Sequence, residues 1–242
     1  MRTFKQSWFI IRGDFRGAKL KILFPVAFSL LFMGYLGGLA TLVLNDSLGG
    51  RDRNVISDFI LLTLVPILGF TYSRRSMKYW SEDSYTKMLM YLKSLPIPLE
   101  VIVNKRKIQS FLSFGMNGIL FFGLIYAFGE HVQANLNWIQ YLSFAFTWIG
   151  YGLMIASVYI YIEFLFSGKA YSWLTMLIMG LSLATAVIIR ISGGNLFIFT
   201  IESSKEWGLL SPVMWVMLLV GLVALQVISK WTLHRLKRRN FI

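Results

Sequence analysis

Long apolar segments, separated by short segments that carry the charges, dominate the pattern of this chain. A helix crosses the roughly 30 Å hydrocarbon core of a bilayer with about 20 apolar residues, at about 1.5 Å per residue. Six segments approach or reach that length: 22–44, 55–72, 108–129, 138–162, 171–189 and 212–228. Segment 55–72 is the weakest, because it is short and contains Asp58. The pattern predicts an all-α membrane protein with six transmembrane helices in a single domain, residues 1–242.

Composition supports this class and excludes others. Apolar residues make up 56% of the chain and charged residues 14%, against roughly 45–50% and 25% in soluble domains. The chain has no cysteine, which excludes disulfides, cysteine nucleophiles and thiolate metal sites. Its net charge of +13 is spread over short segments beside apolar ones, which is typical of the cytoplasmic ends of membrane helices. We therefore expect no nucleic-acid partner.

The distribution of Lys and Arg predicts the orientation. All but four of the 24 lie before the first span, after the sixth, or in the loops after the second and fourth; the exceptions are Arg51, Arg53, Arg190 and Lys205. Cytoplasmic loops carry the excess of basic residues. We therefore expect both termini in the cytoplasm and a location in the plasma membrane.

Residues 1–21 have the pattern of a helix lying in the membrane interface. Apolar residues recur at steps of four and three, and the stripe fades at Ala18. Lys5, Arg12, Arg16 and Lys19 each follow a position of this stripe by one residue, which places them about 100° around a helix. Such a helix buries its apolar stripe at the acyl boundary and directs its cations to anionic lipid head groups. The stripe consists of Phe4, Trp8, Ile11 and Phe15. An ordinary basic juxtamembrane segment is the alternative.

The loop at residues 81–107 predicts a short amphipathic helix joined by a corner to the third span. Ser81, Glu82 and Asp83 suit a helix N-terminus. Pro96 and Pro98 end this helix, and Pro98 can begin the next one, with Glu100 in its first turn. The apolar stripe of the first helix consists of Tyr85, Met88, Leu89, Leu92 and Leu95. Such an element could transmit a push on a cytoplasmic surface into the bilayer, or its stripe could simply rest on the membrane.

Two features inside the predicted spans, a glycine pair and an acidic residue, are candidates for a functional role. Gly34 and Gly38 have the GxxxG spacing that allows two helices to approach closely, so they are a possible helix–helix contact with a second subunit. Asp58 is the only acidic residue inside a span, and a carboxylate at mid-bilayer is costly. We expect it to lie near the outer end in contact with water, in preference to forming a substrate or proton site.

This layout resembles the ABC-2 type permease subunits of ABC transporters. The stretch Leu92-Lys93-Ser94-Leu95-Pro96-Ile97-Pro98-Leu99-Glu100-Val101-Ile102-Val103-Asn104-Lys105 is similar to the family's pattern of a leucine-proline, an apolar pair and a basic residue. The resemblance implies a type V exporter-like fold in which the loop helix is a coupling helix that docks on an ABC ATPase subunit. It also implies a second permease copy or related permease, an N-terminal elbow helix, and a partly re-entrant hairpin in 191–210. A plain extracellular loop is the alternative there.

Missing motifs narrow the function. A P-loop requires GxxxxGK[ST], and Gly168-Lys169-Ala170 lacks the first glycine and the hydroxyl. We therefore expect this chain to bind no cofactor, with ATP and Mg²⁺ on the partner subunit. His131 and His234 lie at opposite faces in the predicted topology, so we expect no shared metal site.

The main prediction is a permease that exports a hydrophobic or amphipathic substrate, peptide or lipid-like. The alternative is a stand-alone six-helix transporter, anchor or sensor without an ATPase.

Overall fold

The computed structural model describes residues 2–15, 19–50, 55–70, 87–91 and 95–238, and within these ranges it contains helices and no strand. The side chains of residues 2, 14, 15 and 19–25 are not described. The helices are α1 (Arg2–Phe15), α2 (Lys19–Leu48), α3 (Val55–Ile67), α6 (Leu99–Phe128), α7 (Glu130–Asn135), α8 (Trp138–Leu165), α9 (Gly168–Ile191), α10 (Leu196–Trp207), the 3-10 helix η2 (Gly208–Leu210) and α11 (Pro212–Arg238).

Five helices of the described chain are long and apolar enough to cross a membrane: α2, α6, α8, α9 and α11. They contain the predicted first, third, fourth, fifth and sixth spans. Two of them run well beyond the predicted bounds. Helix α6 already begins at Leu99, after the proline corner, and α11 continues to Arg238, so that much of the basic tail is helical.

The second predicted span, 55–72, is wrong in its length. Helix α3 has 13 residues, which corresponds to about 20 Å at about 1.5 Å per residue. Pro66 lies in its last turn, and a proline cannot donate the hydrogen bond that a helix interior requires. The chain then turns through residues 68–70, so α3 is too short to cross the bilayer alone.

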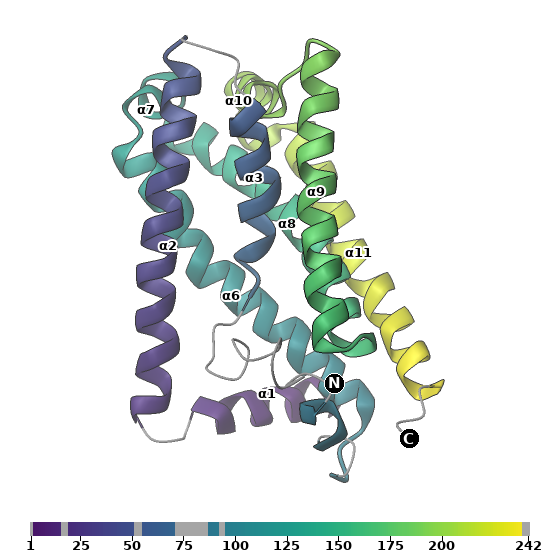
Figure 1. The fold of residues 1–242 in the computed structure, drawn as a ribbon. Coiled ribbons are helices and arrows are strands. Elements are labelled where there is room, and N and C mark those ends of the chain that lie inside the picture. Colours follow the sequence, from purple (N-terminus) through teal and green to yellow (C-terminus); the bar gives the residue numbers. More distant parts are fainter. Residues whose placement is uncertain (1, 16–18, 51–54, 71–86, 92–94, 239–242) are drawn as a thin grey trace.

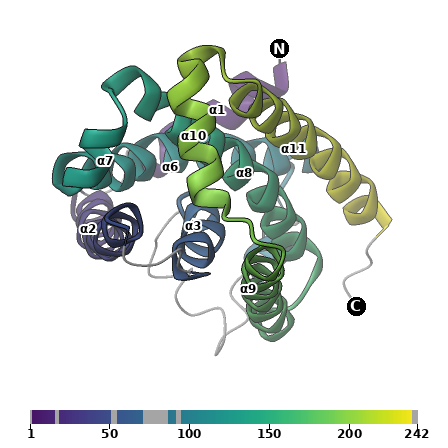
Figure 2. The same ribbon diagram turned by 90° about the horizontal axis from the view of Figure 1, so that it is seen from above.

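The long helices pack around α8, the most buried of the five. Figure 1 shows α1 lying across the foot of the bundle, at the end where α11 also ends; we call this the α1 end. At the opposite end, which we call the α10 end, α10 lies across α8, as the view from above shows (Figure 2). Segment 191–210 thus contains one helix that lies over the bundle, followed by η2, and not a pair of spanning helices.

Helices α8 and α11 approach each other very closely. A Cβ atom on Gly150 would lie 2.5 Å from the carbonyl carbon of Met217, and one on Gly221 would meet the carbonyl group of Gly150. Only glycine permits two backbones to come this near. These two glycines therefore set the crossing of α8 with α11.

Aromatic side chains fill the core towards the α10 end. Phe144 of α8 packs against Phe122 of α6 and Phe197 of α10, with ring centroids 6.4 and 5.9 Å apart. On the outer surface, by contrast, α9 exposes large apolar side chains such as Trp173 (67%) and Ile188 (65%). Apolar faces of this size are unusual on soluble proteins and suit contact with lipid.

Candidate functional site

Helix α3 is bound at one end to α10 through Asp58. The side chain of Asp58 is 2% exposed. Its two carboxylate oxygens accept hydrogen bonds from the backbone N–H groups of Leu196 (2.9 Å) and Phe197 (2.8 Å), the first residues of α10. A carboxylate at a helix N-terminus satisfies free amide groups and interacts favourably with the helix dipole. The expectation of a water-exposed Asp58 is therefore wrong, because α10 covers it.

In the middle of α3, a tyrosine from α8 compensates for Pro66. Because Pro66 has no N–H, the carbonyl of Leu62 four residues earlier lacks its helical partner. The hydroxyl of Tyr151 donates to that carbonyl at 2.9 Å. The defect in α3 thus becomes a specific contact with α8.

The other end of α3 is held by α6. The side-chain amide of Asn117 donates to the carbonyls of Leu68 (2.9 Å) and Phe70 (3.4 Å). The hydroxyl of Ser110 donates to the carbonyl of Gly69 at 3.1 Å, and Ser29 of α2 donates to the side-chain oxygen of Asn117. Asn117 is 1% exposed and lies in the middle of the third predicted span.

These contacts make α3 a broken membrane helix with a satisfied backbone. Non-helical backbone at membrane depth is tolerated only where protein or a water-filled cavity surrounds it. Here α6 supplies the partners, and Ser29 of α2 supports one of them, Asn117. Residues 71–86, which follow this turn, lie outside the described residues. Helix α3 is thus attached to α10 at one end and to α6 at the other.

The predicted coupling residues that the structure describes lie at the α1 end, but they do not share one face. Residues 87–91 are helical, whereas Tyr85 and Leu92 lie outside the described residues. Leu89 is 3% exposed and belongs to an apolar cluster with residues of α6, α8 and α11, while Met88 is half-buried. The neighbouring Met90 (45%) and Tyr91 (60%) are exposed. Leu89 therefore attaches the loop to the bundle, and the outward face presents Met90 and Tyr91.

The proline corner is built as the sequence predicts. Pro98 precedes the first residue of α6, and Glu100 lies in its first turn. Pro96 and Pro98 are exposed, while Leu95 and Ile97 are half-buried. Because α6 continues unbroken from Leu99 to Phe128, the corner is rigidly joined to a membrane-length helix.

Ion pairs and hydrogen bonds tie the start of α6 to its neighbours. Arg106 pairs with Glu163 of α8 at 2.9 Å, with side chains only 12% and 14% exposed. The exposed Glu100 pairs with Lys237 of α11 at 3.4 Å. Ser7 of α1 donates to the carbonyl of Val101 at 3.1 Å. A displacement of the corner would therefore be felt by α1, α8 and α11.

The stripe predicted on the N-terminal helix is divided between two environments. Phe4 (57%) and Trp8 (47%) are exposed, as contact with lipid requires, but Ile11 is 1% exposed and is buried within the protein. The side chain of Phe15 is not described. Helix α1 thus has one face on α6 and another that is free for the membrane interface.

The glycine pair predicted as a helix–helix contact makes none within this chain. Nothing lies within 4 Å of a Cβ atom placed on Gly34 or Gly38, whereas one on the intervening Gly37 would meet Leu124 of α6 at 3.0 Å. Gly37 therefore provides the close approach inside the chain. A contact of Gly34 and Gly38 with a second subunit stays a prediction.

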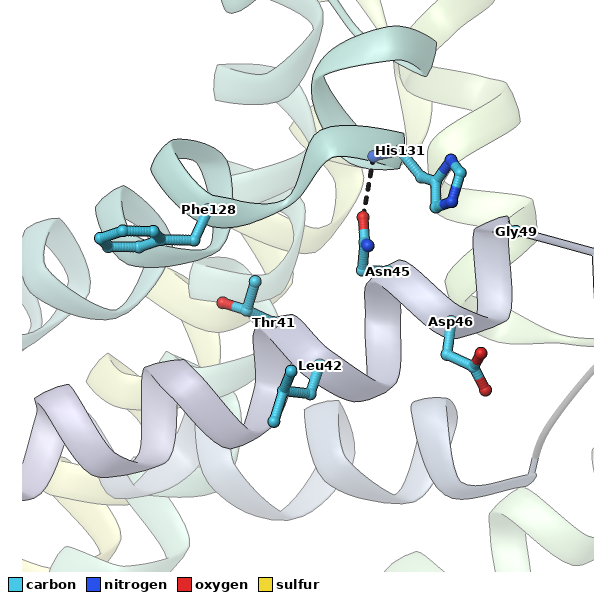
Figure 3. A pocket seen from close by; sticks show the side chains of 7 residues that line it. All are labelled: Thr41, Leu42, Asn45, Asp46, Gly49, Phe128 and His131. Atoms are coloured by element: carbon cyan, nitrogen blue, oxygen red, sulfur yellow. Dashed lines mark hydrogen bonds between the residues drawn. The ribbon is translucent and has the colours of Figure 1, made fainter.

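Two cavities adjoin these elements. A polar one of about 400 Å³ lies at the α10 end, where the side-chain oxygen of Asn45 accepts a hydrogen bond from the backbone N–H of His131 at 2.8 Å (Figure 3). Its lining consists of Thr41, Leu42, Asn45, Asp46, Gly49, Phe128 and His131. Within the part of the chain that the structure describes, no three His, Asp or Glu side chains gather as metal ligands.

The second cavity, of about 250 Å³, lies between α3, α8 and α9. It is largely apolar and has three hydroxyl-bearing side chains in its wall, those of Tyr151, Ser182 and Thr185. An apolar site with a few polar groups suits a ligand that is mainly hydrophobic. Its apolar lining consists of Leu62, Ile155, Val158, Ile178 and Leu181.

The comparison with protein families agrees with this architecture. The model of the ABC-2 family transporter proteins matches residues 50–231, which is most of the chain. The chain belongs to the ABC-2 family of transporter proteins. This ABC-2 protein is accordingly a multi-pass membrane protein and the permease component of an ABC transporter, and the family as a whole works with an ABC ATPase subunit. No curated protein and no solved structure matches it significantly.

The residues that hold α3 were not predicted from the sequence. Asn117 and Pro66 both lie inside predicted spans, where polar side chains and prolines are often functional or need partners. Asn117 and Pro66 could therefore have been recognised from the sequence as residues that need partners. Tyr151 gave none, because tyrosine is common in membrane helices and only the packing of α8 on α3 shows its role.

Proposed function

We propose that this ABC-2 protein is the permease subunit of an ATP-driven exporter in a plasma membrane, with both termini in the cytoplasm. It would work with a second permease copy or a related permease and with two ATPase subunits. The α1 end would then be cytoplasmic and the α10 end external. The observation that carries the proposal is the proline corner, which is exposed and joined without a break to the membrane helix α6.

ATP-driven movement of the ATPase subunits would act on the outward face of the loop, where Met90, Tyr91, Pro96 and Pro98 are exposed. The push would pass along α6 and, through the loop, to α3. Since Asp58 binds α3 to α10, the same movement would reach the external end. ATP can shift such an equilibrium only through its differential interaction with the two states.

For the substrate, we infer a hydrophobic or amphipathic molecule, such as a peptide or a lipid-like compound. The apolar cavity with hydroxyl groups between α3, α8 and α9 supports this class. The position of that cavity beside the broken helix also supports it, because a movement of α3 would change the cavity's shape.

The docking of the ATPase is tested by placing negative charges on the outward face of the loop. We expect Met90→Glu with Tyr91→Glu to reduce co-purification of a P-loop ATPase from the native membrane at least roughly tenfold, because a buried unpaired charge is strongly unfavourable at an interface. Phe166→Glu, at an exposed aromatic of another loop at the same end, is the control and should retain the ATPase. Undiminished binding to the double variant would contradict the docking face, and no ATPase with the wild type would favour the stand-alone alternative.

A further inference from the structure

Lys107 of α6 and Lys230 of α11 lie at the α1 end, where these two helices meet. Among the described residues, the ammonium group of Lys107 bonds to a neutral partner, the side-chain oxygen of Gln226 on α11, at 3.3 Å. Lys230 follows Gln226 by four residues and therefore lies one turn away on the same side of α11. Burial and the positive charge of Lys230 both lower the pKa of Lys107.

No carboxylate of the described chain neutralises this pair. The acidic side chains described at the α1 end are those of Glu100 and Glu163, and they are already paired with Lys237 and Arg106. Lys107 is half-buried while Lys230 is exposed. Holding two like charges together is unfavourable when one of them is half-buried, unless an anion joins them.

The depth of the pair and its surroundings indicate where that anion comes from. Lys107 directly precedes the third predicted span, and Lys230 follows the sixth after Ser229. Towards the membrane centre, exposed apolar residues lie at helical spacing from the lysines: Phe111 (43%) on α6, and Val227 and Val223 (58% each) on α11. A cationic pair at head-group depth with an apolar strip beside it matches a phospholipid, whose phosphate is anionic and whose chains are apolar.

We infer that Lys107 and Lys230 form a binding site for the phosphate of an anionic phospholipid, with the acyl chains along Phe111, Val223 and Val227. The lipid would bridge α6, which begins at the proline corner, and α11, which carries the basic tail. Bound there, it would stabilise the α6–α11 packing beyond what the contact between Lys107 and Gln226 provides.

The test measures lipid binding to the purified full-length protein in detergent. Native mass spectrometry and thermal unfolding are compared for phosphatidylglycerol and phosphatidylcholine with identical chains. We expect tighter binding and a larger rise in Tm with phosphatidylglycerol. The double variant Lys107→Gln/Lys230→Gln should bind phosphatidylglycerol roughly tenfold more weakly and lose most of the rise in Tm.

The matched control is Lys87→Gln/Lys169→Gln, which removes two exposed lysines elsewhere at the same end and should leave both readouts unchanged. Lys107→Arg/Lys230→Arg should retain them, because the charges stay. The single variants should show intermediate losses, and they decide the question if the double variant does not fold. Equal losses in the control, equal binding of the two lipids, or the same rise in Tm with inorganic phosphate alone would each overturn the site.

Discussion

Among single residues, Asp58 has the most unusual position. A carboxylate in an apolar helix would ordinarily be unfavourable, and here it is compensated by two amide donors from a segment 138 residues away in sequence. Asn195 caps the same helix end by accepting from Ile198 at 2.8 Å. The N-terminus of α10 thus has three of its amides satisfied by two side chains, one of which belongs to α3.

Removing the Asp58 carboxylate should destabilise the protein strongly. In Asp58→Ala the buried amides of Leu196 and Phe197 lose their acceptors, and we expect the free energy of unfolding to fall by about 3 kcal/mol. Asp58→Asn retains one acceptor oxygen and should lose less. Thermal unfolding in detergent measures this, with the exposed Asp46→Ala as control. A Tm for Asp58→Ala equal to that of the control would contradict the role of this carboxylate.

The effect of replacing a glycine by alanine depends on the space around its Cα atom, which differs among the glycines of the long helices. Gly150→Ala and Gly221→Ala place a Cβ atom into the backbone of the opposite helix, and we expect each to destabilise the fold by about 1–3 kcal/mol through overpacking. Gly34→Ala, with open space around it, should be neutral or slightly stabilising for the same monomer. The three unfolding temperatures provide the measurement, and a neutral Gly221→Ala would show that α8 and α11 do not cross as described.

At the scale of elements, α3 is defined by its neighbours more than by its own sequence. Asp58 binds it to α10, Tyr151 supplies the partner that Pro66 removes, and Asn117 satisfies the turn after it. The apolar side chains of α3, such as Leu61 and Val65, are also fully buried in the main core. The polar contacts therefore fix the position of a helix that is already packed within the bundle.

The compensation between Tyr151 and Pro66 can be measured as a coupling. Tyr151→Phe removes the hydrogen bond to the Leu62 carbonyl, and we expect a loss of about 1 kcal/mol in the wild type. In a Pro66→Ala background, the new N–H of residue 66 can bond to that carbonyl, so the same change should have a much smaller effect. A double-mutant cycle of unfolding free energies isolates the difference. Equal effects in both backgrounds would mean that the hydroxyl does not replace the helical bond.

Helix α6 is the element that sequence reasoning describes best. Pro96 and Pro98 exclude a continuous helix before residue 99, and everything after Glu100 favours one, so local rules determine the result. The amphipathic stripe before the corner is less informative. Its spacing shows that one face is apolar but cannot tell whether that face meets a partner, lipid or the protein's own core, and Leu89 belongs to the core.

For the whole molecule, the charge distribution predicts an orientation that labelling can test. The chain has no cysteine, so single cysteines can be introduced cleanly. We expect a membrane-impermeant maleimide added to intact cells to label Glu206→Cys at the α10 end but not Lys169→Cys at the α1 end, since the exposed basic loops should be cytoplasmic. Both sites should react after permeabilisation. Labelling of Lys169→Cys in intact cells would reverse the topology and remove the proposed ATPase face.

The sequence by itself determined the class of protein, the five long helices, the corner at Pro96–Pro98 and the family resemblance. Each of these follows from local features: apolar length, charge position and the conformational restriction of proline. Only the tertiary structure decided that α3 stops short, that Asp58 is buried against α10, and that Gly150 and Gly221, not Gly34 and Gly38, make the close crossing within the chain. These depend on which distant segments meet, because a buried polar group is acceptable only where another part of the chain supplies its partner.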